Sequence, residues 1–185
     1  MPRYHLKLDK MFGRWYPVLL TRTAANLWSE SFGKDHPGTN TSQENCFFVD
    51  YKMSSEEGNF SITLDMTLSR GNLSTTLEAI LLADEKHPGF SKWVIPWPNG
   101  ENTLTAIVAV GPEKVNQTRY TWLLTVDCDL KGIVLPDWTL LARVEEEEGI
   151  SNATIHTISH IVDGIHGLHI NDTLSHQPSD CIMKT

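Results

Sequence analysis

The chain has 185 residues, of which 15 are Lys or Arg and 23 are Asp or Glu, so its formal net charge is −8. A hydrophobic content of 40% and a charged content of 21% exclude a disordered chain, and this length suits one domain with a sizeable core. The acidic balance argues against a nucleic-acid partner, because sequence-independent binding needs a basic face. No apolar run approaches the ~20 residues that span a bilayer, so we expect no membrane span.

Alternation of apolar and polar residues dominates from about residue 13 to residue 143. The clearest stretch is 60–68, where Phe60, Ile62 and Leu64 share one face and the residues between them are polar. Segments with Pro, Gly or acidic turn residues, such as 54–58, separate most of the apolar stretches. Short strands at regular spacing predict a sandwich or a closed barrel. The expected strands lie at about 14–21, 46–53, 60–68, 73–82, 90–95, 104–110, 119–128 and 138–144.

One helix is expected after the strands, at about residues 152–166. Ser151 offers an N-cap, and Ile155, Ile158 and Ile165 recur at helical spacing. Gly164 or Gly167 could end this helix. The acidic run 145–148 is interpreted as a solvated connector, and the tail to residue 185 has no periodicity. No linker divides the chain, so 1–185 is expected to be one domain.

Six asparagines begin an Asn-x-Ser/Thr triplet, whereas chance predicts roughly 1.7 such triplets in a chain of this composition. A polar surface rich in Ser and Thr is one explanation, and a secreted, extracellular glycoprotein is the favoured one. No signal peptide is visible at the N-terminus, so we expect a mature form. The expected glycosylation sites are Asn40, Asn59, Asn72, Asn116, Asn152 and Asn171.

Gly13 and Trp15 resemble the Gly-x-Trp signature that opens the first strand of lipocalins, and Arg143 resembles the Arg of their last strand. Residues 45–51, followed by an acidic turn, look like the second strand of insect and blood-feeder lipocalins. The resemblance implies an all-β fold: an eight-stranded antiparallel up-and-down lipocalin barrel with one C-terminal α-helix packed outside. It also implies that Gly13, Trp15 and Arg143 are structural, with the Arg packed over the Trp at the closed end. The alternatives are an unrelated β-sandwich and a fatty-acid-binding protein.

The three cysteines leave at least one sulfur without a partner in the chain. Cys46 and Cys181 match positions that insect and blood-feeder lipocalins tie together, so the resemblance implies a disulfide between them. Cys128 matches a position whose usual partner lies upstream, and no cysteine occurs there. Cys128 could be a buried free thiol, an intermolecular disulfide or, least favoured, a catalytic thiolate.

An eight-stranded barrel has room for one small ligand. Alternation, counted from an inward Trp15, places mostly apolar side chains inside, including Leu73, Ile95 and Leu124. The connection at about 22–44 carries Leu27, Trp28 and Phe32, and it could be a lid over the open end or a solvated loop. The expected ligand-binding residues are Phe47, Val49, Tyr51, Ile62, Leu64, Met66, Leu77, Trp93, Trp122 and Trp28.

The favoured function is to bind and transport or sequester a small hydrophobic ligand, such as a fatty acid, pigment, steroid or eicosanoid, in the barrel cavity. The alternative is a lipocalin scaffold that engages a host or partner protein through the 22–44 loop. We expect no catalytic residue, no enzyme activity and no cofactor. His156 and His160 lie four residues apart on the expected helix, a spacing that can bind a metal, but surface histidines are favoured and no metal site is expected.

Overall fold

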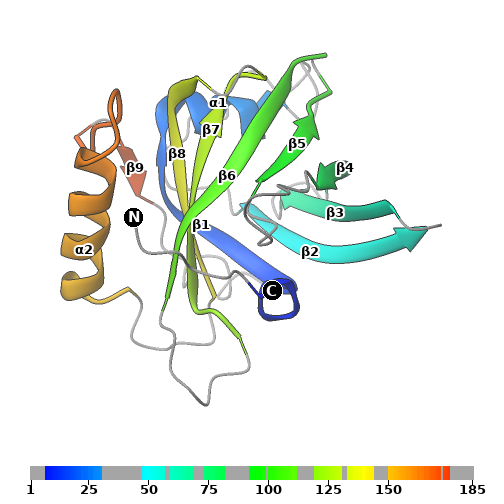
Figure 1. Cartoon of the computed structure of the whole chain (residues 1–185), viewed down its shortest axis with the longest axis horizontal. Helices are drawn as coiled ribbons and strands as arrows, with labels where there is room; N and C mark the ends of the chain where they lie inside the picture. The colour runs from blue at the N-terminus through cyan, green and yellow to red at the C-terminus, as the bar shows by residue number, and fades with distance from the viewer. Residues whose placement is uncertain are drawn as a thin grey trace.

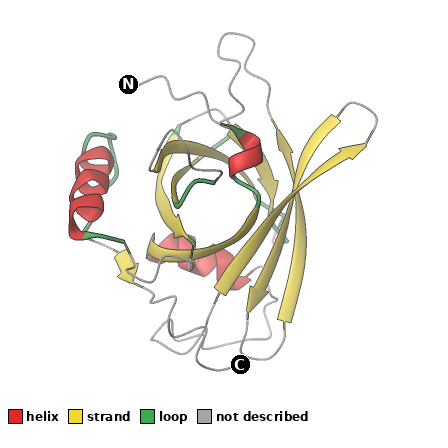
Figure 2. Cartoon of the chain, turned by 90° about the horizontal axis from the view of Figure 1, so that it is seen from below, coloured by secondary structure: helices red, strands yellow, loops and turns green. Residues whose placement is uncertain are grey.

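A computed structural model describes residues 7–30, 47–56, 59–68, 73–81, 92–98, 100–111, 119–130, 133–143, 150–171 and 173–175. Eight strands follow one another around a barrel (Figures 1 and 2). A short 3-10 helix, η1 (Leu8–Lys10), precedes the first strand. The strands are β1 (Gly13–Thr21), β2 (Phe47–Glu56), β3 (Asn59–Leu68), β4 (Leu73–Leu81), β5 (Lys92–Pro96), β6 (Asn102–Gly111), β7 (Trp122–Cys128) and β8 (Val134–Ala142).

The sheet closes on itself through β1. Each strand pairs antiparallel with the next from β2 to β8, β8 pairs with β1, and β1 pairs with β2 at Trp15↔Val49. The structure therefore confirms the eight-stranded up-and-down barrel with a C-terminal helix. Strand ends differ by a few residues from expectation, most at β8, which begins at Val134 rather than near residue 138.

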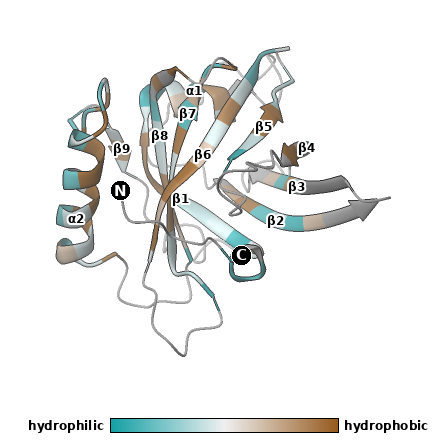
Figure 3. Cartoon of the chain, viewed as in Figure 1, coloured by the Kyte–Doolittle hydropathy of each residue, from teal (hydrophilic) through white to brown (hydrophobic). Residues whose placement is uncertain are grey.

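Helix α2 (Asn152–Asp163) packs outside the barrel (Figure 1). The Ser151 hydroxyl caps it by accepting a hydrogen bond from the Thr154 backbone N–H at 3.1 Å, and the helix ends at Gly164. α2 carries both hydrophobic and hydrophilic residues (Figure 3), and its Ile158 and Val162 are buried against outward side chains of the strands, such as Trp138. The described helices include none that is long and apolar enough to cross a membrane.

The connection expected at 22–44 begins instead with a helix, α1 (Arg22–Glu30). The Thr21 hydroxyl accepts a hydrogen bond from the Ala24 N–H at 3.3 Å, so the last residue of β1 caps the helix. Ala24 and Ala25 are buried against Leu20. A helix that follows a strand without a Gly or Pro between them offers no break in the sequence, which is why the segment resembles a loop.

A ninth strand, β9 (Thr173–Ser175), lies in the tail for which no periodic structure was expected. It pairs antiparallel with β1 over Leu19–Thr21. Three residues are too few to show an alternating pattern, so sequence alone could not identify this strand.

The predicted inward orientation of Trp122 and Leu124 is wrong. Both pack in the outer cluster beneath α2, and the Trp122 indole lies against Gly111, where a Cβ atom would approach it to 2.2 Å. Their neighbour Leu123 belongs to the interior cluster instead. Because α2 covers this part of the sheet, the outward face of β7 is apolar while the inward face carries the charged Asp127, so hydrophobicity indicates the wrong face.

Candidate functional site: the barrel interior

One end of the barrel is sealed by the side chain of Arg143, which is 8% exposed. Its guanidinium carbon lies 4.0 Å from the centroid of the Trp15 ring, in the contact that the lipocalin resemblance implied. The guanidinium also donates hydrogen bonds of 2.8 Å to the carbonyls of Tyr120 and Phe12, and longer ones to Lys10 and Arg14. The Trp15 indole N–H donates to the Met11 carbonyl at 2.6 Å.

Two features of the structure favour glycine at position 13, at this end of the barrel. Its φ is +102°, a left-handed conformation that side chains rarely adopt, and a Cβ there would lie 3.1 Å from Nη1 of Arg143. The Gly-x-Trp pattern thus allows the backbone to pass close beneath the guanidinium.

Above this seal the interior is lined mainly by apolar and aromatic side chains. Six of the expected ligand-binding residues are buried in the same cluster as Trp15, and Trp28 of α1 packs against that cluster. The side chains of Phe47 and Ile62 lie outside the described part of the chain, as does Phe32. The six interior residues are Val49, Tyr51, Leu64, Met66, Leu77 and Trp93.

Trp93 carries an unsatisfied polar group in this interior. Its side chain is 1% exposed, and its indole N–H has no hydrogen-bond partner in the described structure. The ring makes an edge contact with Tyr51 across the barrel, with centroids 6.1 Å apart. By contrast, the Trp97 indole N–H donates to the Thr103 hydroxyl at 2.9 Å. An unpartnered buried N–H costs about 1–3 kcal/mol of stability. A ligand that accepts a hydrogen bond from Trp93 would therefore bind favourably here.

Asp127 is a buried carboxylate of the interior, and it was not among the expected site residues. Leu124 and Val126 face the outer cluster, and alternation along β7 therefore turns Asp127 inward. Its carboxylate accepts a hydrogen bond of 2.6 Å from the Thr105 hydroxyl on β6. The β7–β8 register shifts between Val126 and Cys128, so Asp127 lies at a bulge, a feature common beside functional sites.

Burial raises the pKa of Asp127 to about 6, with Asp137 on β8 acting in the same direction through its charge and the Thr105 hydrogen bond opposing it. Burial, reinforced by the charge of Asp127, raises the pKa of Tyr51 as well. At neutral pH this region therefore combines an ionised carboxylate, a neutral phenol and an indole.

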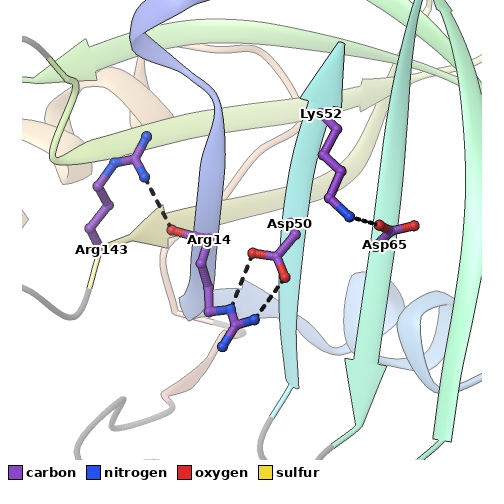
Figure 4. A network of polar contacts seen from close by, with 5 residues as sticks. All are labelled: Arg14, Asp50, Lys52, Asp65 and Arg143. Carbon is purple, nitrogen blue, oxygen red and sulfur yellow. Dashed lines mark hydrogen bonds and ion pairs between the residues drawn. The ribbon is translucent and has the colours of Figure 1, made fainter. Parts of the chain in front are cut away.

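Unlike Asp127, the acidic residues Asp50 and Asp65 of the outer face lie beside cationic side chains (Figure 4). The Arg14 side chain donates two hydrogen bonds, of 2.9 and 3.1 Å, to the Asp50 carboxylate. Lys52 pairs with Asp65, which also accepts from the Thr76 hydroxyl. Each of these solvent-accessible carboxylates has a cation, whereas no ion pair involves Asp127 among the described residues.

At the other end of the barrel, α1 is tied to β8 through Asp137. The Thr21 hydroxyl, which caps α1, donates to Asp137 at 3.2 Å. Because Trp28 packs against the interior cluster, α1 turns this large aromatic side chain toward the barrel, as expected for a lid.

The remaining expected features are distributed over the molecule. Cys128 is buried and free, and burial raises the pKa of its thiol, which disfavours the reactive thiolate. Cys46 and Cys181 lie outside the described residues, so the proposed disulfide stays a prediction.

The rings of His156 and His160 are in contact, with centroids 4.5 Å apart, and both residues are exposed. Within the described ranges, no group of three or more His, Cys, Asp and Glu is placed to hold a metal ion.

Two of the six expected glycosylation sites can be placed on the surface. Asn152 and Asn171 are exposed, beside and within the turns that flank α2. Asn59 opens β3, but its side chain is not among those described, and the other three sites lie outside the described ranges.

Sequence comparison finds no matching family model and no matching curated protein. Comparison of structures finds an odorant-binding protein, with 12% identity and a TM-score of 0.54 over 96% of this chain and 97% of the other. Insecticyanin from the tobacco hornworm Manduca sexta matches with 14% identity and a TM-score of 0.53 over 95% and 82% of the two chains. A biogenic amine-binding protein matches with 10% identity and a TM-score of 0.51 over 98% and 92%. At these identities the likeness establishes the fold.

Proposed function

Because the chain has the lipocalin fold, we propose that it binds and transports or sequesters a small hydrophobic ligand in the interior of its barrel. The observation that carries this proposal is the unpartnered indole N–H of Trp93, buried among apolar and aromatic side chains. A ligand with an apolar body and a hydrogen-bond acceptor would satisfy that N–H. Its affinity would come mainly from the burial of apolar surface.

The two ends of the barrel support the proposal. Trp15 and Arg143 form a fixed seal at one end, held by hydrogen bonds to the backbone. The other end carries α1, whose Trp28 turns toward the interior. This inward orientation favours the lid over a protein-binding loop as the role of α1. Binding, rather than catalysis, fits the raised pKa of the Cys128 thiol, which disfavours a nucleophilic thiolate.

The test is a pair of substitutions on adjacent residues of β4. Ala79 is fully buried in the interior, and Ile80 is exposed. We expect Nile red, a neutral apolar dye, to bind with a stoichiometry of one and a gain in fluorescence. Ala79→Phe fills the interior and should weaken this binding by roughly tenfold or more, whereas Ile80→Phe should bind as the unaltered protein does. Absence of saturable binding, or equal binding by both variants, would refute the proposal.

We also propose that the chain is a secreted glycoprotein. The support is the excess of Asn-x-Ser/Thr triplets and the exposure of Asn152 and Asn171. Expression through a secretory pathway, followed by endoglycosidase treatment, should lower the apparent mass, and an unchanged mass would contradict this.

A further inference from the structure

The proposed ligand can be given a chemical class from the charge inside the barrel. We propose that the ligand carries a protonated amine and that the Asp127 carboxylate binds this amine, with the aromatic rings of Tyr51 and Trp93 beside it. This inference rests on the proposed function, since it concerns the same interior.

Asp127 has no cationic partner among the described residues. It is 9% exposed, and its one hydrogen bond among the described residues comes from the neutral hydroxyl of Thr105. A hydroxyl stabilises a carboxylate but leaves its charge in place. Buried charges in proteins are ordinarily paired, so an interior carboxylate without a cation leaves a charge for a ligand to neutralise.

The described titratable groups around Asp127 supply no positive charge. Those that act electrostatically with Asp127 are Asp137 on β8, Tyr51 on β2 and the adjacent Cys128 on β7, whose side chains are neutral or anionic at any pH. The buried cation of the barrel, Arg143, is engaged with backbone carbonyls and Trp15 at the closed end. The field around Asp127 therefore favours a cation and opposes a second carboxylate, such as that of a fatty acid.

Two aromatic side chains of the interior lie in contact with each other. Tyr51 and Trp93 meet edge to face, and the electron-rich faces of such rings attract ammonium groups. The Trp93 N–H, which has no partner in the part of the chain that the structure describes, can donate to a hydroxyl or carbonyl oxygen elsewhere on the ligand. The combination fits a small amine whose body is apolar and which also carries a hydrogen-bond acceptor.

The experiment compares amines with neutral molecules of the same shape. Tyramine is matched with 4-propylphenol, and octylamine with 1-octanol, with binding measured by calorimetry at pH 7.5. We expect each amine to bind about ten- to a hundredfold more tightly than its neutral partner, the range for a hydrogen bond to a charged group. Asp127→Asn keeps the size of the side chain. This variant should lose the preference for amines and keep its affinity for the neutral molecules.

Asp65→Asn is the matched control, because Asp65 is a carboxylate of the outer face that pairs with Lys52. This variant should keep the amine preference, and circular dichroism should show that both variants are folded. A second measurement is the pH dependence, since both amines stay protonated from pH 5 to pH 7.5. Ionisation of Asp127, whose pKa is about 6, should raise amine affinity roughly tenfold over this range and leave the neutral partners unchanged.

The outcomes separate the two proposals. No preference for either amine, or a preference that survives Asp127→Asn, overturns the amine inference even if Nile red and the neutral molecules bind. Failure of Nile red and of all four matched probes to bind overturns the proposed function together with it.

Discussion

Two of the buried ionisable side chains of the barrel, Arg143 and Asp127, are nearly equal in exposure, at 8% and 9%, but very different in their surroundings. Arg143 donates to the backbone carbonyls of Phe12, just before β1, and of Tyr120, just before β7, and it lies on the Trp15 ring. Asp127 accepts one hydrogen bond among the described residues, from the Thr105 hydroxyl. Burial alone therefore does not distinguish a structural charge from a binding group. The distinction lies in whether the protein itself supplies the compensating partners.

Loss of the compensated charge of Arg143 should change the free energy of unfolding more than any other substitution considered below. Arg143→Met leaves the Tyr120 and Phe12 carbonyls without their donor and removes the contact with Trp15. We expect the free energy of unfolding to fall by about 3–5 kcal/mol, as for a broken buried charged network. Urea unfolding followed by tryptophan fluorescence measures this. A loss below about 1 kcal/mol would mean that Arg143 is not required to hold the closed end.

Loss of the uncompensated charge of Asp127 should change the free energy of unfolding in the opposite direction, toward greater stability. The pKa of Asp127 is raised from 3.8 to about 6 in the folded protein, so the native state binds the proton more tightly than the unfolded state does. The stability that Asp127 contributes is therefore full below pH 4 and is lost as the pH rises through 6. Asp127→Asn should become more stable relative to the unaltered protein between pH 4 and pH 8, by up to about 3 kcal/mol.

This prediction is checked by urea unfolding of the ligand-free protein at both pH values. Asp137 and Tyr51, which face Asp127, are present in both proteins, so their titration largely cancels in the difference. A stability difference that does not change with pH would show that the interior carboxylate is already compensated.

The solvent-accessible carboxylates should give the smallest effect. The side chains of Arg14 and Asp50 are 50% and 22% exposed, and solvent weakens such pairs. Asp50→Asn should lower the free energy of unfolding by less than about 1 kcal/mol, and less still in high salt. A loss as large as that of Arg143→Met would remove the distinction between inner and outer charges.

The sequence predicted the strands well because each strand with one polar face alternates visibly, as at Phe60, Ile62 and Leu64. It also predicted α2, where Ser151 and Gly164 mark both ends. It failed where local signals are weak. α1 follows β1 without a break, β9 is three residues long, and the outward face of β7 is apolar beneath α2, which hid the outward orientation of Trp122.

The interior aromatic residues Tyr51 and Trp93 could be identified by alternation, but Asp127 could not. A single carboxylate in the otherwise apolar or neutral segment 122–128 was the available signal. Its meaning depends on which face it occupies, and that is set by the bulge near Val126 and by α2. Its neighbours Tyr51, Thr105 and Asp137 come from β2, β6 and β8, and only closure of the barrel brings them together.

β9 has a consequence for how the molecule behaves among copies of itself. β2 pairs with β1 at Gly13–Trp15, and farther along β1 the same edge is taken by β9 at Leu19–Thr21. An unpaired strand edge is a template for other chains and a route to aggregation. Three residues from the C-terminal region thus protect the seam at which the barrel closes, and they make solubility depend on a segment far from the interior.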